Sequence, residues 1–432
     1  MNKVIIVGGG LAGTEAAWQL ARRQIECELW EMRPHTMTPA HHSGDLAELV
    51  CSNSLRAMGM ENAVGLLKEE MRRLDSVIMA AAGATAVAAG GALAVDRKAF
   101  SADVESRLAA SPYVTVRREE LRELPAGPVI IAAGPLASPA LSDALAQLTG
   151  TKLYFHDAIA PIVDGATIDR EIAFYASRYD KGGGADYLNC PLNQDQYLHF
   201  YEQLRAAELH PLADFEPEKL FSGCMPIESM AKLGVETMRF GPMKPVGLTL
   251  PGGGEAYAVV QLRRENAAGD MFNLVGFQTR LKRPEQQRVF RLIPGLEKAE
   301  FLRYGAMHRN TYIDSPRLLD GHMRLKERQN LIFAGQISGV EGYVESAASG
   351  LAAGLTMGAM IRGGDLPKFP LTTAMGALLN YAATASGAFQ PMNINFGLLP
   401  PLTERIRNKK QKNAAIAARS LADLTKFIEE WL

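Results

Sequence analysis

The stretch that decides the fold is Val4–Gly13, which reads VIIVGGGLAG and stands close to the start of the chain. Its apolar residues predict a buried parallel strand, and the glycines that follow predict a tight turn into a helix over residues 15–23. A second apolar run, Cys27–Trp30, completes a strand–helix–strand unit that ends at Glu31. Such a unit is typical of a Rossmann-like α/β domain built on a parallel sheet.

Three glycines of this stretch, Gly8, Gly10 and Gly13, form the pattern G-x-G-x-x-G between strand and helix. In dinucleotide-binding proteins they allow a tight turn, close approach of the backbone to a pyrophosphate, and close packing of helix on strand. Glu31 follows Gly10 by 31 − 10 = 21 residues, where a carboxylate accepts the hydroxyls of an adenosine ribose. A glycine triplet alone would be equally compatible with a plain turn. The context predicts a dinucleotide site made by Gly8, Gly9, Gly10, Leu11, Ala12, Gly13 and Glu31.

Two later apolar runs also end in glycine, PVIIAAG at 128–134 and LIFAG at 331–335. We expect them to join the first strand in one sheet. Because a flavin lies extended and contacts several returning segments, this pattern favours FAD over NAD. Gly134 is then expected on the adenosine side, and Gly335 and Gly342 lead into a helix whose N-terminus faces the flavin. Ordinary strand–helix turns in a large α/β protein are the alternative.

The length of 432 residues predicts two domains, or one domain with a large insertion. The segment between the second and third glycine-terminated runs is richer in aromatic residues, charges and turn signals. We therefore predict an FAD-binding domain over 1–150 and 331–432, and an inserted mixed α/β domain for substrate or RNA over 151–330. An amphipathic helix is expected over 413–431.

The charge balance is nearly neutral, with 46 Lys and Arg against 47 Asp and Glu, which excludes a uniformly basic nucleic-acid coat. Any phosphate-binding surface must be local, although a solvated charged face is the usual interpretation of such clusters. No signal peptide or membrane-spanning stretch is expected, and the protein is predicted to be cytoplasmic. The candidate basic residues are Arg280, Lys282, Arg283, Arg405, Arg407, Lys409, Lys410 and Lys412.

The cysteines Cys27, Cys51, Cys190 and Cys224 include no C-x-x-C pair, which argues against a disulfide framework or a structural zinc site. Cys27 lies in a predicted strand and is expected to be an inert core residue. Cys51 (in VCSNSL) and Cys224 (in FSGCMPIE) lie in small, polar, turn-forming surroundings. Either could be a nucleophile, and spacing alone does not favour that role over a structural one.

The histidines give no metal signature. His35, His41 and His42 lack a spacing such as H-E-x-x-H, so we interpret them as polar loop residues and predict no metal. His308 lies in the polar cluster MHRNTY, which would line a cleft or cap a strand.

Ten sequence blocks, spread over nearly the whole chain, resemble those of the folate- and FAD-dependent tRNA (uracil-5-)-methyltransferase family, TrmFO. Gly9 and Thr14 stand where many relatives carry Ala and Ser, and neither change touches the three motif glycines. The blocks are GGGLAGTEAAW (8–18), EMRP (31–34), TPAH (38–41), VCSNSL (50–55), GGALAVDR (90–97), ADYLNCP (185–191), FGPMKPVG (240–247), LVGFQT (274–279), MHRNTY (307–312) and GVEGYVESA (339–347).

This resemblance implies a flavoprotein that takes a methylene group from methylenetetrahydrofolate and delivers it as methyl to C5 of the T-loop uridine at position 54 of tRNA. It implies NADPH or NADH as the reductant, tRNA and folate as partners, and no obligate protein partner. By motif match the two catalytic cysteines are Cys51 and Cys224, and His308 matches a histidine associated with folate stacked on the flavin. We favour Cys224 as the residue that attacks uracil C6, because Gly223 and Pro226 suggest an exposed turn.

Rival functions share parts of this pattern. A ribosomal-RNA uracil methyltransferase would use the same chemistry on another RNA. A larger flavoprotein that modifies the wobble uridine carries a long helical C-terminal domain, for which 432 residues leave little room. A flavin-dependent oxidoreductase acting on a small molecule, or a noncatalytic FAD-binding module, would need no RNA.

Overall fold

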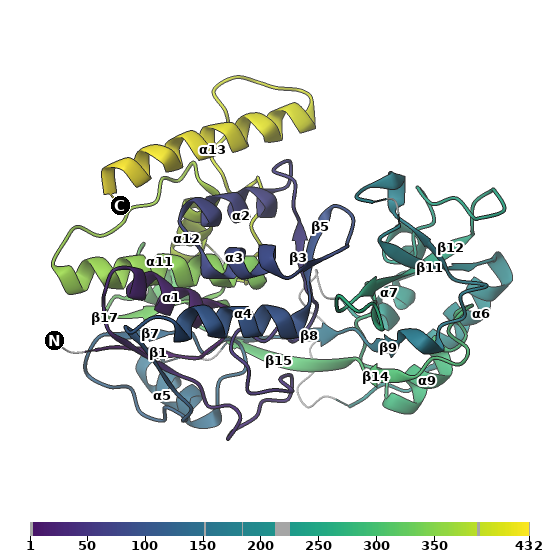
Figure 1. Ribbon diagram of the computed structural model, residues 1–432, viewed down its shortest axis with the longest axis horizontal. Coiled ribbons are helices and arrows are strands. Elements are labelled where there is room, and N and C mark those ends of the chain that lie inside the picture. Colours follow the sequence, from purple (N-terminus) through teal and green to yellow (C-terminus); the bar gives the residue numbers. More distant parts are fainter. Residues whose placement is uncertain (1–2, 151–152, 184, 212–224, 387–388, 432) are drawn as a thin grey trace.

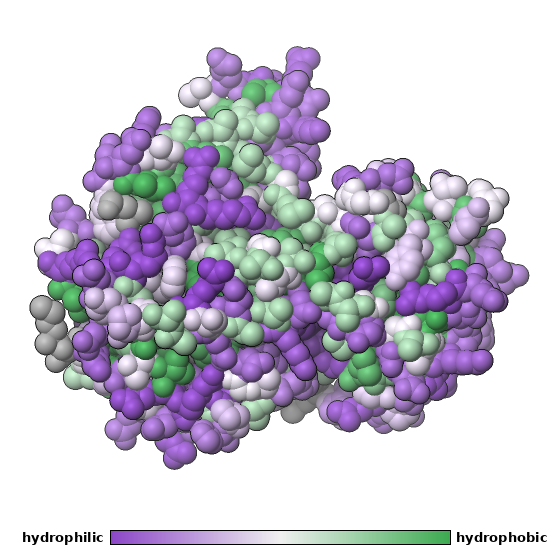
Figure 2. All heavy atoms as spheres, viewed as in Figure 1, coloured by the Kyte–Doolittle hydropathy of each residue, from purple (hydrophilic) through white to green (hydrophobic). Residues whose placement is uncertain are grey.

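The computed structural model describes residues 3–150, 153–183, 185–211, 225–386 and 389–431. Figure 1 shows its elements in two groups side by side, one around a parallel sheet and one around an antiparallel sheet. Figure 2, in the same view, shows a notch in the upper edge of the molecule between these two groups.

The first sheet contains every glycine-terminated run identified in the sequence, which confirms that they share one sheet. Parallel pairing places Ile6 of β1 opposite Leu29 of β2 on one side and opposite Ile130 of β7 on the other. All neighbours are parallel except β16, which pairs antiparallel with β17. In spatial order the strands are β16 (Arg324–Leu325), β17 (Arg328–Phe333), β7 (Val129–Ile131), β1 (Val4–Val7), β2 (Cys27–Trp30) and β6 (Val114–Arg117).

Helix α1 (Leu11–Arg22) begins earlier than the predicted residue 15, because it starts directly after its N-cap Gly10 and includes Gly13 in its first turn. It packs against α11 (Tyr343–Arg362), which is mostly buried within the molecule. A side chain at Gly350 of α11 would come within 2.1 Å of the Ala12 carbonyl oxygen, so glycine allows this close approach.

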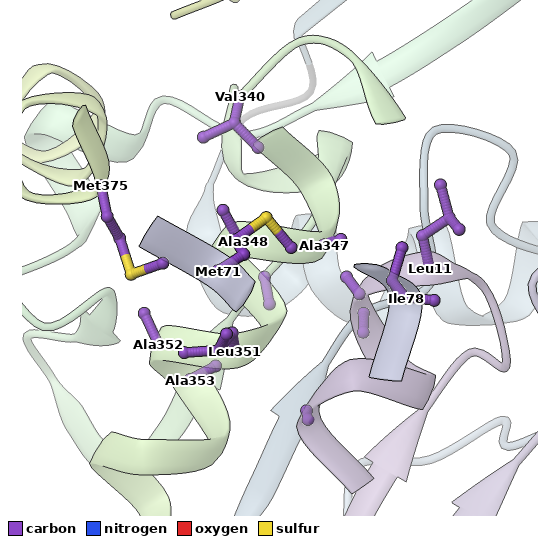
Figure 3. Close-up of a cluster of buried hydrophobic side chains, with 14 of the residues drawn as sticks. Leu11, Met71, Ile78, Val340, Ala347, Ala348, Leu351, Ala352, Ala353 and Met375 are labelled. Atoms are coloured by element: carbon purple, nitrogen blue, oxygen red, sulfur yellow. The ribbon is translucent and has the colours of Figure 1, made fainter. Parts of the chain in front are cut away.

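Further helices bury the outer face of α11. Figure 3 shows Met71 of α2 and Met375 of α12 gathered around Ala348, Leu351 and Ala352 of α11. The C-terminal helix, predicted over 413–431, is α13 (Lys409–Trp431). The other elements around the parallel sheet are α2 (Ala63–Arg73), α3 (Val77–Ala84), α4 (Arg97–Ala109), α5 (Pro139–Thr149), α10 (Ser315–Leu318), η5 (Gln336–Ser338), α12 (Ala374–Thr384), and a small sheet of β3 (Ser54–Ala57), β5 (Ala92–Val95) and β4 (Ala86–Val87).

The second large sheet is antiparallel and has its own apolar core, in which Phe200, Phe277 and Phe290 pack ring against ring. Its strands, in spatial order, are β10 (Phe174–Ala176), β11 (Tyr187–Leu192), β12 (Ala258–Arg264), β13 (Met271–Leu274), β9 (Ile162–Asp164) and β14 (Phe301–Arg303). The helical elements of this region are η1 (Gly165–Thr167), η2 (Arg178–Asp180), α6 (Gln194–Ala206), α7 (Ile227–Leu233), α8 (Thr237–Phe240) and α9 (Arg283–Phe290).

A two-stranded ribbon of β8 (Leu153–Ile159) and β15 (Ala306–Tyr312) runs between the two groups (Figure 1). The fold class is therefore the predicted one, a Rossmann-like α/β region combined with a mixed α/β region. The domain limits at 150 and 331 stay a prediction; β16 and the start of β17 belong to the parallel sheet and lie before residue 331.

Candidate active site

The glycine-rich turn after β1 contains two kinds of glycine, those that packing requires and one that borders open space. Gly8 has φ 104°, and a Cβ there would lie 2.4 Å from the Ala132 carbonyl oxygen. A Cβ at Gly13 would lie 1.9 Å from the Gly8 carbonyl oxygen. A Cβ at Gly10 would meet no atom of the described chain within 4 Å. Gly8 and Gly13 are thus required by the packing of the turn, whereas the space beside Gly10 is left for something else.

The N-terminus of α1 opens into that space. The first N–H groups of a helix have no partner within the helix, and the N-cap Gly10 supplies no side-chain acceptor. These N–H groups and the positive end of the helix dipole make a site for an anion. The residues present therefore fit the pyrophosphate of a dinucleotide.

A cavity of about 150 Å³, partly open to solvent, runs past this turn. Gly9 and Gly342 are not part of its lining; a Cβ at Gly9 would meet Leu46 at 2.5 Å, and one at Gly342 would meet Glu345 Oε2 at 2.4 Å. The same is true of Gly13, packed against Gly8. The predicted residues that do line the cavity are Gly8, Gly10, Leu11, Ala12, Glu31, Gly134 and Gly335.

Glu31, at the end of β2, is buried in the wall of this cavity. Its Oε1 accepts from the main-chain N–H and the Nε of Arg33 at 3.0 and 2.9 Å, and its Oε2 accepts from Gly9 N and Arg33 Nη2 at 2.9 and 3.1 Å. Burial alone would raise the pKa of Glu31, but the hydrogen bonds and charge of Arg33 and the Gly9 N–H lower it below its usual value. The carboxylate is ionised, and it fixes the glycine turn as well as facing the cavity.

Sequence reasoning missed several residues of the lining, notably Arg33, Thr38 and His41. His41 Nδ1 lies 2.6 Å from Thr38 Oγ1, and burial together with the Arg33 charge lowers the pKa of His41 to about 4. His41 lies in a loop, as the sequence predicts, and it is also a neutral histidine of the cavity wall. The available signal was the position of TPAH, which follows EMRP after three intervening residues.

Cys51 lies beside the same cavity, next to the lining residue Val50. Its main-chain N–H donates to the hydroxyl of Tyr343 at 2.7 Å, and its carbonyl oxygen accepts from Arg303 Nη2 at 3.0 Å and from Arg97 Nη2 at 3.3 Å. Its thiol is partly buried and lies 3.8 Å from the Ala158 carbonyl oxygen. The main chain of Cys51 is therefore held on both sides.

Tyr343 connects the cysteine to the cavity. It is the first residue of α11, lines the cavity, and its hydroxyl accepts from the N–H groups of both Cys51 and Ser52. Burial of its hydroxyl, and the negative charge that Cys51 would carry, raise the pKa of Tyr343. The hydroxyl stays protonated and acts as a neutral acceptor.

The other cysteines differ. Cys27 in β2 and Cys190 in β11 are buried, and burial raises the pKa of each thiol to about 12, so neither is a nucleophile near neutral pH. Cys224 lies outside the described residues. His308 stands in β15 opposite Asp157 of β8, and its side chain is likewise outside the described part.

Several comparisons place this geometry among known proteins. The family model described as glucose inhibited division protein A matches residues 3–365. The methylenetetrahydrofolate–tRNA-(uracil-5-)-methyltransferase TrmFO of Heliobacterium modesticaldum is 58% identical over 99% of this chain and 98% of that relative. The protein of the same name from Geobacter sulfurreducens is 56% identical over 99% and 98%. Aquifex aeolicus GidA, in its form II crystal, superposes with a TM-score of 0.72 at 17% identity, over 99% of this chain and 75% of that one, which shows a shared fold.

Proposed function

Because the chain belongs to the TrmFO family, we propose that it methylates C5 of the T-loop uridine at position 54 of tRNA, with methylenetetrahydrofolate as the carbon donor and FAD as the electron carrier. The observation that carries this proposal is one continuous site. The cavity that begins at the glycine-rich turn is also lined by Val50 and Tyr343, and Tyr343 holds the main chain of Cys51.

The cofactor would be held by residues already described. The N–H groups at the start of α1 and the space beside Gly10 would take the pyrophosphate, and Glu31 with Arg33 would face the adenosine ribose. Bound FAD supplies the electrons that reduce the transferred methylene group to methyl. We also propose that NADPH or NADH is the reductant, that Gly134 lies on the adenosine side, and that Gly335 and the α11 N-terminus contact the flavin.

The cysteines would supply nucleophilic catalysis. C5 of uracil is a weak nucleophile, and addition of a thiolate to C6 makes C5 reactive toward an electrophilic carbon. We propose Cys51 and Cys224 for this chemistry, one adding to C6 and the other assisting at the same centre, with His308 near the folate. The target base must first leave its stack, as in other enzymes that act on a base.

The RNA would approach across the notch seen in Figure 2. The basic residues between 405 and 412 are exposed and lie just before and within the first turn of α13. In the view shared by Figures 1 and 2, the starting end of α13 lies beside this notch. Asn413 donates to the Glu61 carbonyl oxygen at 3.0 Å, so this end of α13 sits close to the segment that follows β3. Local positive charge of this kind would bind phosphates despite the overall balance of −1.

We further propose that the enzyme works in the cytoplasm, without a membrane or an obligate protein partner. Helix α11 is long and apolar enough to cross a membrane by length and composition, but 78% of its apolar window is buried inside the molecule. It belongs to the core around which α1, α2 and α12 pack.

The decisive experiment supplies methylenetetrahydrofolate labelled in its methylene carbon, NADPH, and unmodified tRNA, and then locates the label by digestion and mass spectrometry. We expect label at C5 of uridine 54. Unmodified ribosomal RNA in place of tRNA should remain unlabelled, and labelled S-adenosylmethionine should not replace the folate. Label in ribosomal RNA, or from S-adenosylmethionine, would contradict the proposal.

The roles of the two cysteines are separated by tRNA carrying 5-fluorouracil, which traps a covalent adduct at C6. We expect the trapped complex with Cys51→Ala and its loss with Cys224→Ala. The reverse result would assign the attack to Cys51, and adducts in both variants would refute attack by either cysteine.

A further inference from the structure

Three arginines surround the segment that carries Cys51, and they come from distant parts of the chain. Arg97 starts α4, Arg263 lies in β12, and Arg303 ends β14. Arg263 binds the side chains of Asn53 and Ser52 at 2.9 and 2.6 Å. The other two reach the main chain of Cys51 itself.

Arg97 and Arg303 differ in how their charge is balanced. Arg97 forms an ion pair with Glu265, which is buried. Arg303 donates only to the carbonyl oxygens of Val50 and Cys51, at 3.1 and 3.0 Å, and its Nε has no hydrogen-bond partner within the part of the chain that is described. Burial and the Arg97 charge lower the pKa of Arg303 to about 10, so the group is still a cation at neutral pH.

Burying a cation against neutral carbonyl groups is unfavourable unless attraction to a nearby negative charge offsets the loss of hydration. Glu265 is a buried carboxylate that acts on all three arginines, but one carboxylate offsets one of three positive charges. The thiolate form of Cys51 would add a second negative charge, with which Arg303, Arg97 and Arg263 also interact electrostatically. The two Nη groups of Arg303 form a fork that binds two successive carbonyl oxygens at the same time, a geometry that the single ammonium group of lysine cannot reproduce.

We propose that Arg303 is a positioning residue for the reaction: its guanidinium holds the main chain of Cys51 in place and provides positive charge that favours the thiolate. Because Arg303 belongs to the antiparallel sheet and Cys51 to the segment beside the cavity, the contact also joins these two parts of the molecule at Cys51. This inference rests on the proposed function of Cys51.

The test measures the rate at which iodoacetamide alkylates Cys51 as a function of pH, read peptide by peptide by mass spectrometry on the full-length, flavin-loaded protein. Removing a close positive charge should shift the midpoint of this profile upward by about one pH unit in R303M, which lowers the rate about tenfold at a fixed pH below the midpoint. R303K keeps the charge and loses the fork, so its midpoint should stay near that of the wild type while its methyl-transfer kcat falls.

Arg291 offers a matched control. It also donates twice to a main-chain carbonyl oxygen, that of Ala299, at 3.1 and 2.9 Å, and among the described residues it forms no hydrogen bond to the Cys51 segment. R291M should leave the alkylation profile unchanged. Flavin content and melting temperature identify any variant that fails to fold, and R303Q, a smaller change, then replaces R303M in the same assay.

An unshifted midpoint in R303M or R303Q would overturn the proposal, and so would an equal shift in R303K or R291M. Alkylation needs neither RNA nor folate. A shifted midpoint in a protein that transfers no methyl group would therefore reject the proposed function and leave the role of Arg303 standing.

Discussion

The glycine-rich turn and the Cys51 segment both border the same cavity, but they are held in opposite ways. The turn is fixed largely within its own strand–helix–strand unit, through Gly13 against Gly8 and Glu31 against Gly9, with one further contact from Gly8 to Ala132 at the end of β7. The Cys51 segment is fixed by side chains from three other places in the chain. The difference implies that cofactor binding and thiol chemistry can be impaired separately. Changes at the turn should weaken flavin binding, whereas changes around Cys51 should lower the rate of methyl transfer while flavin stays bound.

The strongest test of this separation is Cys51→Ala. Because covalent activation of the base has no substitute in the site, we expect methyl transfer to fall by about 10⁴-fold or more, with one flavin still bound per chain. Cys224→Ala should lose activity similarly. Cys27→Ala and Cys190→Ala are the controls, since both thiols are buried in strands, and they should keep activity per folded molecule. Loss of flavin from Cys51→Ala would show that the two regions are not separable.

The converse change is Gly10→Leu. Its side chain would fill the space beside the α1 N-terminus, so we expect the FAD dissociation constant to rise at least about 10³-fold, equivalent to about 4 kcal/mol. The apoprotein should still melt cooperatively. Gly83→Leu is a matched control: Gly83 is exposed in α3 with nothing within 4 Å of its Cβ position, and this variant should bind flavin normally.

Gly13→Ala sharpens the same prediction, because its Cβ would lie 1.9 Å from the Gly8 carbonyl oxygen. It should lower the melting temperature of the apoprotein, unlike Gly10→Leu. Equal melting temperatures for the two variants, with equal flavin loss, would contradict the distinct roles of these glycines.

The sequence predicted the turn well and the Cys51 surroundings poorly for a physical reason. Strand, turn and acidic residue lie within one contiguous unit, so their spacing encodes their geometry. The contacts to Cys51 span 46, 252 and 292 residues, from Arg97, Arg303 and Tyr343, and no local pattern specifies such pairings. The motif blocks predict Cys51 as a candidate because its family signature is local, but its contacts form only where two sheets and α11 meet.

The predicted glycine set shows the same limit at smaller scale. Gly342 leads into the helix whose N-terminus is predicted to face the flavin, and that contact stays a prediction. A Cβ there would collide with Glu345 and Asn393, so packing at the α11 N-terminus is by itself sufficient to require glycine. A glycine that faces a ligand and one that faces a neighbouring side chain have the same letter in the sequence. Only the surrounding atoms distinguish them.

A smaller effect is expected from Glu15, which anchors α1 behind the turn. Glu15 is buried, accepts hydrogen bonds from Ser76 Oγ at 2.6 Å and Ile78 N at 3.1 Å, and burial raises its pKa from 4.5 to about 7. The folded protein therefore retains this proton over a range in which the unfolded chain has released it. The stability that this provides is complete below pH 4.5 and is lost as the pH rises to about 7.

Glu15→Gln cannot titrate and should lack this dependence. Relative to the wild type, its free energy of unfolding should improve by up to about 3 kcal/mol as the pH rises from 4.5 to about 7. Urea unfolding at a series of pH values measures the difference. A constant difference between variant and wild type across this range would show that Glu15 is ionised throughout, and flavin binding at pH 8 should be little affected in either case.

The smallest effect, and the finest probe of the Cys51 side of the comparison, is Tyr343→Phe. Removing the hydroxyl leaves the N–H groups of Cys51 and Ser52 without their acceptor at a partly buried position, which costs about 1–3 kcal/mol. Part of that cost should appear as misplacement of the thiol, so we expect methyl transfer to fall about tenfold, equivalent to about 1.4 kcal/mol, while the ring preserves the cavity wall and flavin binding. Tyr381→Phe is the control, because its hydroxyl donates to the Gln390 carbonyl oxygen at 2.9 Å, away from the cavity. If Tyr343→Phe released flavin and kept its methyl-transfer rate per bound flavin, Tyr343 would belong to the cofactor site alone and the link between the two regions would have to run through the arginines.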